Sequence, residues 1–281
     1  MEQGTEQKMK QPIISLEHVS KTYHIYKSNR QCFSRELLGR ETGDAQTVLK
    51  DINLEIQAGE RVAVLGNVGS GRTTLINLLA GITSPTEGTV TVRKKTGLIR
   101  NLKVGFLKEM SGRKNIILQG AVFGWSKKEC KEREKEIIEF AEVSDIIDHP
   151  LNTYTGTDMN RLGLAIQTTM KSDIILFDAP FTKGDPAFRA KSIQRMQDMC
   201  AAGTGTLVMV TNDAKLARIL CTRAILLNNK EIEMDGAVKD VFAYYKKKRK
   251  ERVKNFKESD RARELMRREE ELNEMDIDEF G

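Results

Sequence analysis

Glycine and hydroxyl residues crowd one short stretch of the chain, GNVGSGRTT at positions 66–74, between the apolar runs RVAVL and LINLLA. Glycines let successive backbone amides turn inward, and the start of a following helix adds positive potential, so the pattern is suited to bind phosphate. A glycine-rich turn without chemistry is the alternative, but a place after a strand and before a helix argues against it. The candidate nucleotide-binding residues are therefore Gly66, Asn67, Val68, Gly69, Ser70, Gly71, Arg72, Thr73 and Thr74.

Arg72 occupies the position at which the phosphate-loop pattern G-x-x-x-x-G-K-[ST] has lysine. A guanidinium keeps the positive charge but is a wide planar fork, whereas an ammonium is a compact point charge. We expect Arg72 to neutralise phosphate with a poorer fit than lysine gives.

A candidate metal ligand ends a second apolar run, DIILFD at 173–178. The carboxylate of Asp178 is expected at the tip of a strand adjacent to the one before the glycine-rich loop, where it can hold the water shell of Mg²⁺. The hydroxyl of Thr73 would bind the same ion. A lone strand ending in aspartate is a weak signal, but together with the loop it predicts a magnesium site made by Thr73 and Asp178.

The elements that must position these residues alternate between strands and helices. Some runs are apolar throughout, as in strands buried on both faces of a parallel sheet, and others alternate like half-buried strands. This alternation predicts an α/β fold, interrupted by a helical block from about 113 to 170. The apolar runs are 61–65, 173–178, 205–210 and 223–228, and the other strands are 13–19, 47–56 and 88–92.

Composition excludes several classes of protein. No apolar stretch approaches the roughly 20 residues that span a bilayer, and the N-terminus lacks the apolar core of a secretion signal. The net charge of +6 is uneven, since 246–257 is strongly basic and 269–281 is acidic. We expect this tail to be a solvated helix, with contact to a membrane surface or a partner as the alternative. The cysteines lack metal-ligand spacing, which predicts reduced thiols at Cys32, Cys130, Cys200 and Cys221.

Further motifs accompany the phosphate loop: VSKTYHIY at 19–26, EMSGRKNIILQGAVFG at 109–124, NTYTGTDMNRLGLAI at 152–166 and GDPAF at 184–188. With them the chain resembles the ATP-binding cassette (ABC) subunits of bacterial exporters of capsular polysaccharide, O-antigen and teichoic acid. The resemblance implies the P-loop NTPase fold, which is α/β with a mixed central sheet, an N-terminal antiparallel β subdomain and an inserted α-helical subdomain.

The resemblance also implies a division of the chain. The cassette covers about residues 13–245, and its helical subdomain covers about 109–170. Residues 1–12 would be a flexible N-terminus, and 246–281 would be a charged C-terminal tail.

Ligands and partners follow from the same resemblance. ATP and Mg²⁺ would be the cofactors, Tyr23 would stack on adenine, and Asp185 would belong to the D-loop. Such cassettes work as dimers, in which the signature segment of one subunit completes the phosphate site of the other. The 109–148 region would transmit closure of the dimer to a separate integral membrane permease, and Trp125 either lines the docking groove or packs in the interior. The chain would be a peripheral subunit on the cytoplasmic face of the bacterial cell membrane, and no nucleic acid is expected as a partner.

Several departures from the family pattern fall on positions that handle ATP. A positioned general base contributes about 10²–10⁴ in rate, none of which an alanine supplies. An aspartate beside the signature would repel the phosphate of the partner subunit. We therefore expect that no catalytic residue is intact and that ATP is bound with weak or absent hydrolysis. The departures are Ala179 for the glutamate that polarises water, Asn212 for the histidine at the γ-phosphate, Thr157 for the signature glycine, Asp158 beside it, and Arg72.

The residues leave alternatives. One alternative is ordinary hydrolysis, which other groups such as Asp213 would have to support. Another is that nucleotide binding is lost together with hydrolysis. A homodimer would have two altered sites, and a heterodimer with an intact cassette would have two mixed ones. A non-enzymatic scaffold or regulator that pairs with a permease or an active cassette is the second hypothesis. A nucleic-acid-associated cassette is the third, although the chain has neither tandem cassettes nor a long coiled coil.

Overall fold

The computed structural model describes residues 11–25, 44–178, 185–202 and 205–258, together with 264, 265 and 267. The chain consists of two units, Met1–Val238 and Lys239–Gly281. None of the helices in the described ranges is long and apolar enough to cross a membrane. The expected flexible N-terminus at 1–12 falls almost wholly outside the described residues.

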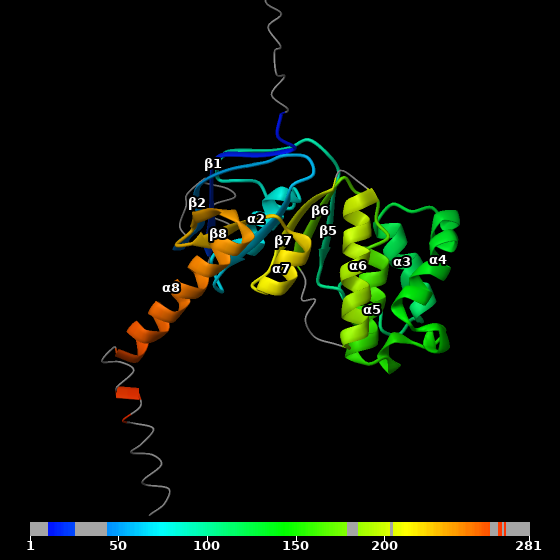
Figure 1. The fold of residues 1–281 in the computed structure, drawn as a ribbon. Helices are drawn as coiled ribbons and strands as arrows, with labels where there is room; N and C mark the ends of the chain where they lie inside the picture. Colours follow the sequence, from blue (N-terminus) through cyan, green and yellow to red (C-terminus); the bar gives the residue numbers. More distant parts are fainter. Residues whose placement is uncertain are drawn as a thin grey trace, which may run out of the picture. The chain divides into compact units, whose positions relative to one another are not determined.

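A six-stranded sheet in the first unit carries the glycine-rich loop (Figure 1). Its strand order is β5-β6-β7-β3-β8-β9, and neighbouring strands are parallel except for the antiparallel pair β8 and β9. Strands β3, β6 and β7 are buried along most of their length, which explains their unbroken apolar sequences. The expected mixed α/β sheet is therefore confirmed. The strands are β3 (Arg61–Gly66), β5 (Thr96–Arg100), β6 (Ile174–Asp178), β7 (Thr206–Val210), β8 (Arg223–Asn228) and β9 (Glu231–Ala237).

Two strands and one adjacency differ from the sequence expectation. β5 is only five residues long and contains a glycine, and β9 is a largely polar edge strand, so neither shows a clear strand pattern. The expected adjacency of the strand of Asp178 to the strand before the loop is wrong, because β7 lies between β6 and β3. Parallel strands are joined by crossover connections, so their order in the sheet does not follow their order in the sequence.

A second sheet has the order β2-β1-β4, with both pairs antiparallel, which confirms the N-terminal antiparallel β subdomain. One hydrophobic cluster joins this sheet, the six-stranded sheet and helix α2, through buried side chains such as Leu16, Val64 and Leu75. Burial of this cluster holds α2, and with it the glycine-rich loop, against both sheets. The elements are β1 (Ile14–Ile25), β2 (Asp44–Ile56), β4 (Glu87–Val92) and α2 (Arg72–Leu79).

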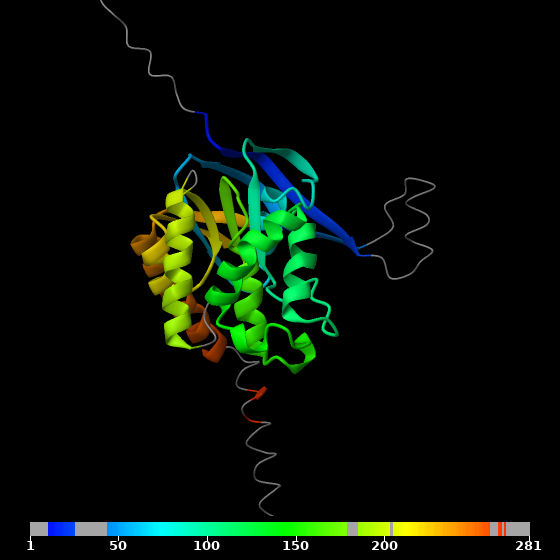
Figure 2. The same ribbon diagram turned by 90° about the vertical axis from the view of Figure 1, so that its right-hand side faces the viewer.

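Three helices, α3, α4 and α5, form a group beside the sheet, drawn in green in Figures 1 and 2. Each begins after a residue whose side-chain oxygen accepts from a backbone amide of the first turn: Ser111, Ser126 and Thr155. This group confirms the expected α-helical subdomain. The helices are α3 (Gly112–Val122), α4 (Lys127–Ala141) and α5 (Gly156–Gln167), and α6 (Pro186–Ala202) and α7 (Ala214–Leu220) follow in the chain.

The second unit is described mainly by helix α8, Val238–Glu258. The basic half of the expected charged tail therefore lies within a helix that begins several residues before it. The acidic half, 269–281, lies outside the described residues.

Candidate nucleotide-binding site

The glycine-rich loop joins the end of β3 to the start of α2. Gly71 is the N-cap of α2 and has a φ of 96°, a left-handed conformation that a Cβ disfavours. A Cβ on Gly71 would also lie 2.8 Å from the carbonyl oxygen of Val48. A Cβ on Gly66 would collide with the hydroxyl of Ser70 and would lie 2.7 Å from the carbonyl oxygen of Leu227. Glycine is therefore required at both positions for the loop to keep this shape.

The start of α2 offers hydrogen-bond donors that no described protein group takes. No side chain in the described ranges caps this helix, and its first turn contains no acidic residue. The hydroxyl of Ser70 is buried and has no hydrogen-bond partner among the residues that the structure describes. Buried polar atoms are nearly always paired in native proteins, and a helix N-terminus attracts anions. The loop therefore fits a phosphate group, whose oxygens would accept from these donors.

Thr73 and Asp178, the two predicted metal ligands, lie side by side. The hydroxyl of Thr73 donates to a carboxylate oxygen of Asp178 at 3.1 Å. Thr73 of α2 reaches Asp178 at the end of β6, although β7 separates β6 from β3, because α2 packs against β6 as well as against β3 and β7. A hydroxyl and a carboxylate are the kind of oxygen donors that Mg²⁺ prefers. The pair therefore fits a magnesium ion that accompanies a bound nucleotide.

The remaining residues of the loop differ in exposure. The side chain of Arg72 is half-buried and makes no hydrogen bond or ion pair with a described residue, so its charge is available to a ligand. The carbonyl oxygen of Asn67 accepts from the amide of Ser70 at 3.1 Å and closes a turn. Within this turn Val68 is almost fully exposed, whereas Thr74 in α2 is buried.

Tyr23, the expected adenine-stacking residue, lies on β1 opposite Gln46 of β2. Its side chain is exposed, and the ammonium of Lys21 lies 5.0 Å from the centroid of its ring. An exposed aromatic face suits stacking on a base. The adenine contact stays a prediction.

Asn212, at the position of the family's histidine, is bound to the phosphate loop itself. Its side-chain oxygen accepts from the backbone amide of Gly66 at 3.3 Å, and its side-chain nitrogen donates to the carbonyl oxygen of Gly66 at 3.0 Å. These two bonds tie the segment after β7 to the end of β3. Both polar atoms of the Asn212 side chain are therefore already hydrogen-bonded to the protein backbone.

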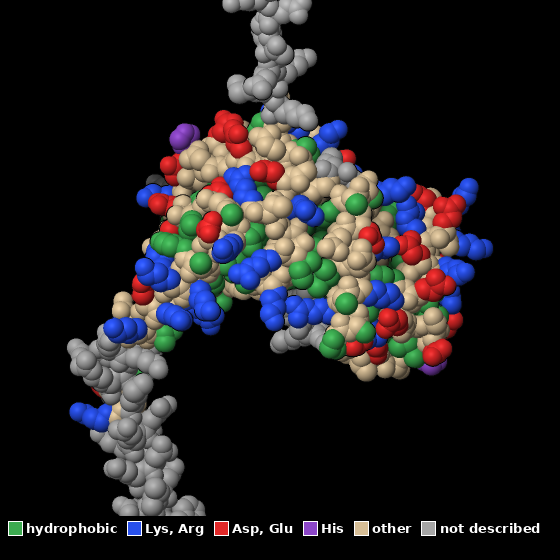
Figure 3. Space-filling view, viewed as in Figure 1, with side chains coloured by type: hydrophobic (Ala, Val, Ile, Leu, Met, Phe, Trp, Pro, Cys, Tyr) green, Lys and Arg blue, Asp and Glu red, His purple; other side chains and the backbone are tan. Residues whose placement is uncertain are grey.

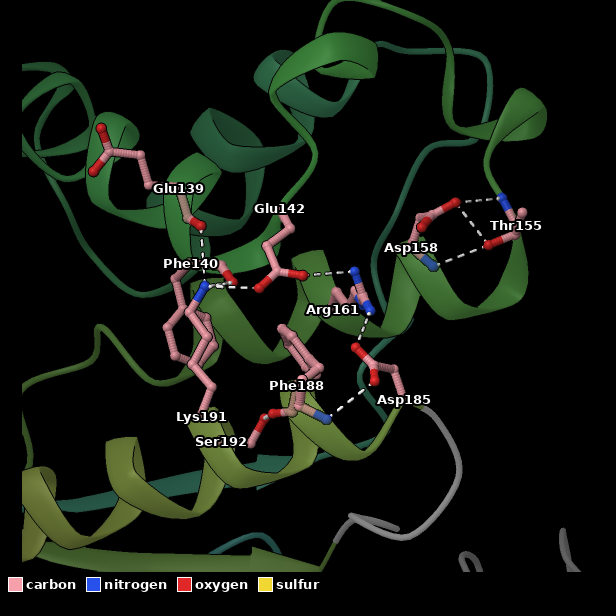
Figure 4. A network of polar contacts seen from close by, with 11 residues as sticks. Glu139, Phe140, Glu142, Thr155, Asp158, Arg161, Asp185, Phe188, Lys191 and Ser192 are labelled. Carbon is pink, nitrogen blue, oxygen red and sulfur yellow. Dashed lines mark hydrogen bonds and ion pairs between the residues drawn. The ribbon is translucent and has the colours of Figure 1, made fainter.

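The signature segment begins helix α5, and a capping box closes the N-terminus of this helix. The carboxylate of Asp158 accepts from the amide of Thr155 at 3.2 Å and from its hydroxyl at 2.6 Å, and that hydroxyl accepts from the amide of Asp158 at 3.2 Å (Figure 4). Thr157, at the position of the signature glycine, is exposed in the same turn. A carboxylate therefore already occupies the helix end that would face a phosphate, and it repels a second anion.

A charged network joins this helix to the start of α6 (Figure 4). Arg161 of α5 donates to Glu142 at 2.9 Å and to Asp185 at 3.3 Å, and its guanidinium lies 4.8 Å from the ring centroid of Phe188. Lys191 of α6 donates to the same Glu142 at 3.1 Å. These bonds tie the predicted D-loop residue Asp185 to the signature helix of its own chain.

Ala179, which the sequence places where the family has its catalytic glutamate, lies outside the described residues, as do 180–184. Its chemistry follows from its identity alone, because a methyl side chain cannot take a proton from water.

Known proteins resemble this chain over most of its length. The ABC transporter family model matches residues 49–182. The ABC transporter protein AbcA of Aeromonas salmonicida is 31% identical over 239 residues, which cover 85% of this chain and 77% of that protein. The chain belongs to the ABC transporter family.

Two further relatives of this cassette carry export in their names. The O-antigen export system ATP-binding protein RfbB of Klebsiella pneumoniae is 30% identical over 84% of this chain and 98% of that protein. The teichoic acids export ATP-binding protein TagH of Shouchella clausii is 35% identical over 83% of this chain and 65% of that protein. Among solved structures, the dimeric ATP-binding cassette MJ0796 with ADP and Pi has a TM-score of 0.64 and 25% identity, covering 80% of this chain and 98% of that one. This likeness confirms the P-loop NTPase fold.

Two features of this cassette's site are absent from the sequence expectation. The cap of α5 does have a sequence signal, since Thr155 and Asp158 stand in the T-x-x-D spacing of a capping box. The pairing of Asn212 with Gly66 has no local signal, because the two residues are 146 positions apart and meet only through the sheet.

Proposed function

We propose that this cassette is the nucleotide-binding subunit of an ABC exporter of a cell-surface polysaccharide or teichoic acid, and that it binds Mg·ATP with weak or absent hydrolysis. The observation that carries the proposal is the open start of α2, where the buried hydroxyl of Ser70 has no described partner and Thr73 lies against Asp178. The triphosphate would accept from the loop amides, and Arg72 would add a positive charge.

Weak hydrolysis is supported by what the other catalytic positions do. Ala179 cannot act as a base, and Asn212 is bonded to Gly66. Loss of a positioned base alone lowers a rate by about 10²–10⁴. Binding and closure are therefore the steps in which this subunit takes part.

The second cassette of the dimer matters because each phosphate loop faces the signature helix of the other subunit. In a homodimer both loops would face an α5 that Asp158 has already capped. In a heterodimer the loop of this chain faces the intact signature of its partner. A nucleotide bound at the open start of α2 would therefore be completed by the partner subunit more favourably in a heterodimer than in a homodimer.

A permease is proposed as the other partner, with this chain as a peripheral subunit at the cytoplasmic face of the membrane. Gln119 of α3 donates to the carbonyl oxygen of Val104 at 3.3 Å and holds the preceding loop against the helix. Trp125 is half-buried, and the guanidinium of Arg133 lies 4.8 Å from its ring centroid. Its place in a docking groove stays a prediction. Large contiguous apolar patches mark interaction sites. The candidate docking surface is this loop with α3, because both expose apolar side chains: Val104, Leu107, Met110, Ile117 and Val122.

The test is a titration of the purified chain with a fluorescent ATP analogue and Mg²⁺, with phosphate release measured on the same preparation. We expect saturable binding that weakens at least about tenfold in Asp178→Ala, because the metal loses a charged ligand. The matched control is Asp145→Ala, at an exposed aspartate after α4, which leaves binding unchanged. No binding at millimolar analogue overturns the nucleotide proposal, and phosphate release as fast as in an intact cassette overturns weak hydrolysis.

A scaffold or regulator is the second candidate, and the closed start of α5 favours it. Such a subunit would occupy a permease or pair with an active cassette without using nucleotide. Co-purification with the permease and the second cassette separates the two candidates. A complex whose activity is unchanged by Asp178→Ala supports the scaffold, and a complex that loses activity supports the nucleotide-binding subunit.

A further inference from the structure

Helix α8 carries a concentration of positive charge that the nucleotide site does not use. Eight of the chain's 46 basic residues lie between 246 and 257, together with only one of its 40 acidic residues, Glu251. Without this segment the basic excess of the chain disappears. The net charge of +6 is therefore a local property of one helix rather than of the whole surface.

Most of the basic side chains of α8 whose exposure is described are turned to solvent, and Lys248 is half-buried. Residues 246, 247 and 249–255 are exposed, and Figure 3 shows basic side chains over this helix just before the grey residues. At 3.6 residues per turn, four lysines fall within about a third of the helix circumference and form one stripe. We call these four the lysine stripe: Lys246, Lys247, Lys250 and Lys254.

The charge pattern of α8 works against the helix itself. Lys246 and Lys250, and Lys250 and Lys254, are like charges four positions apart, which destabilise a helix. Helix α4, which is also rich in charge, instead pairs opposite charges at the same spacing: Lys128 with Glu132, Arg133 with Glu129, and Lys135 with Glu139. Opposite charges at this spacing therefore account for much of the charge of α4, whereas like charges predominate at this spacing in α8. An anionic partner would remove the repulsion.

We propose that α8 binds the anionic phospholipid headgroups of a membrane surface through the lysine stripe. Clusters of basic residues on a helix are attracted to the negative surface potential of such membranes. Val253, which is 51% exposed, lies at the edge of the lysine stripe on the helix circumference, and an aliphatic group there suits the boundary between headgroups and acyl chains. A nucleic acid has the charge but not this boundary, so the lipid surface is the better match. The inference is independent of nucleotide binding.

The acidic segment 269–281 is a competing occupant, because it contains seven acidic residues and no basic one. If this segment covers the lysine stripe, its removal strengthens binding to lipid. The experiment therefore includes the full chain and a variant that ends at Arg268.

The experiment is co-sedimentation of the full chain with vesicles of phosphatidylcholine alone and of phosphatidylcholine mixed with phosphatidylglycerol. We expect binding to the anionic vesicles only, weakening as salt is raised. The test variant replaces the lysine stripe by glutamine (K246Q, K247Q, K250Q and K254Q), which keeps helix propensity and removes four charges. The control variant makes the same change at four exposed lysines of α4 (K127Q, K128Q, K131Q and K135Q).

The proposal predicts that the stripe variant binds anionic vesicles at least about tenfold more weakly, while the α4 variant binds like the native chain. Circular dichroism of both variants checks that the helices persist. Equal losses in the two variants would show a non-specific charge effect and overturn the proposal. So would a lack of binding to anionic vesicles by both the full chain and the chain ending at Arg268. Displacement of the vesicles by an equal charge of single-stranded or duplex nucleic acid would assign α8 to that partner instead.

Discussion

Two helix N-termini of this cassette present the same backbone chemistry to opposite effect. At the start of α2, which we call the open end, no described side chain accepts from the free amides, and the first turn contains no acidic residue. At the start of α5, which we call the closed end, the carboxylate of Asp158 and the hydroxyl of Thr155 satisfy each other's backbone amides. An anion site at a helix N-terminus therefore depends on which backbone amides the neighbouring side chains leave unpaired, more than on the helix itself.

The start of α5 is also joined to neighbouring segments by ion pairs. Arg161 joins α5 to Glu142 after α4 and to Asp185 before α6, so the capped turn belongs to a network of ion pairs. The open end is held instead by burial of α2 in the hydrophobic core, which leaves its polar start unobstructed. One helix is thus fixed through its apolar face and the other also through its charged groups.

The largest effect is expected from closing the open end with Gly71→Ala. A residue other than glycine at this φ costs about 1–2 kcal/mol, and the new Cβ would also overlap the carbonyl oxygen of Val48. The loop must then change shape, and we expect the affinity for Mg·ATP to fall at least about a hundredfold by calorimetric titration.

Gly81→Ala is the matched control, at the other end of α2. Gly81 also has a positive φ, of 68°, but a Cβ there meets no atom within 4 Å. We expect a similar backbone cost and an unchanged nucleotide affinity. Equal losses of affinity in the two variants would mean that stability, rather than the shape of the loop, decides binding.

A smaller effect is expected from releasing the loop with Asn212→Ala. The amide and carbonyl of Gly66 are buried, and losing both partners lowers the free energy of unfolding by about 1–3 kcal/mol. Urea unfolding measures this change. Asn152→Ala, at an exposed asparagine whose side chain makes no bond to a described residue, should stay within about 0.5 kcal/mol of the native chain.

Opening the closed end with Asp158→Ala should have a milder effect on stability, about 0.5–2 kcal/mol, because a capping box is lost. Glu129→Ala removes the equivalent box of α4 and serves as control. Sedimentation velocity with Mg·ATP then separates the two, since only Asp158→Ala frees a signature helix for a partner phosphate. An ATP-dependent dimer of the native chain would show that the cap does not block association.

The smallest effect at neutral pH is expected from the phenol of Tyr154, beside the cap of α5, because it titrates only in alkaline solution. Burial, followed by the charges of Asp148 and Asp158, raises the pKa of Tyr154 to about 12. The folded chain therefore keeps the phenol neutral, and stability that is complete below pH 10 declines as pH rises toward 12, because the unfolded chain loses its proton first. Absorbance of phenolate measures this, and Tyr154→Phe should remove the late titration. A normal pKa for Tyr154 would contradict the burial of this segment.

Sequence patterns predicted the open end well and the closed end poorly, for physical reasons. The loop at 66–74 is read from glycines and flanking apolar runs, which are local features of one segment. The contact of Thr73 with Asp178 followed from that loop even though the order of the strands did not. Comparison with the family pattern identified Asp158 only as a departure from that pattern. The hydrogen bonds through which Asp158 caps α5 depend on the turn that begins at Thr155.

Long-range pairings lie beyond such patterns. The bonds of Asn212 to Gly66 and of Arg161 to Asp185 join segments whose meeting depends on the complete fold. Short or polar strands such as β5 and β9 are not predicted from the sequence for a related reason, because pairing with neighbouring strands, more than their own residues, stabilises them as strands.

Hydrogen exchange of the backbone amides at the two helix starts, with and without Mg·ATP, tests the central claim in one experiment. Ligand oxygens that accept from the amides of 71–74 should slow their exchange, while the amides of Thr155 and Asp158, already satisfied by the cap, should exchange at the same rate in both states. Slower exchange at Thr155 and Asp158, or no change at 71–74, would show that the start of α2 is not the phosphate site.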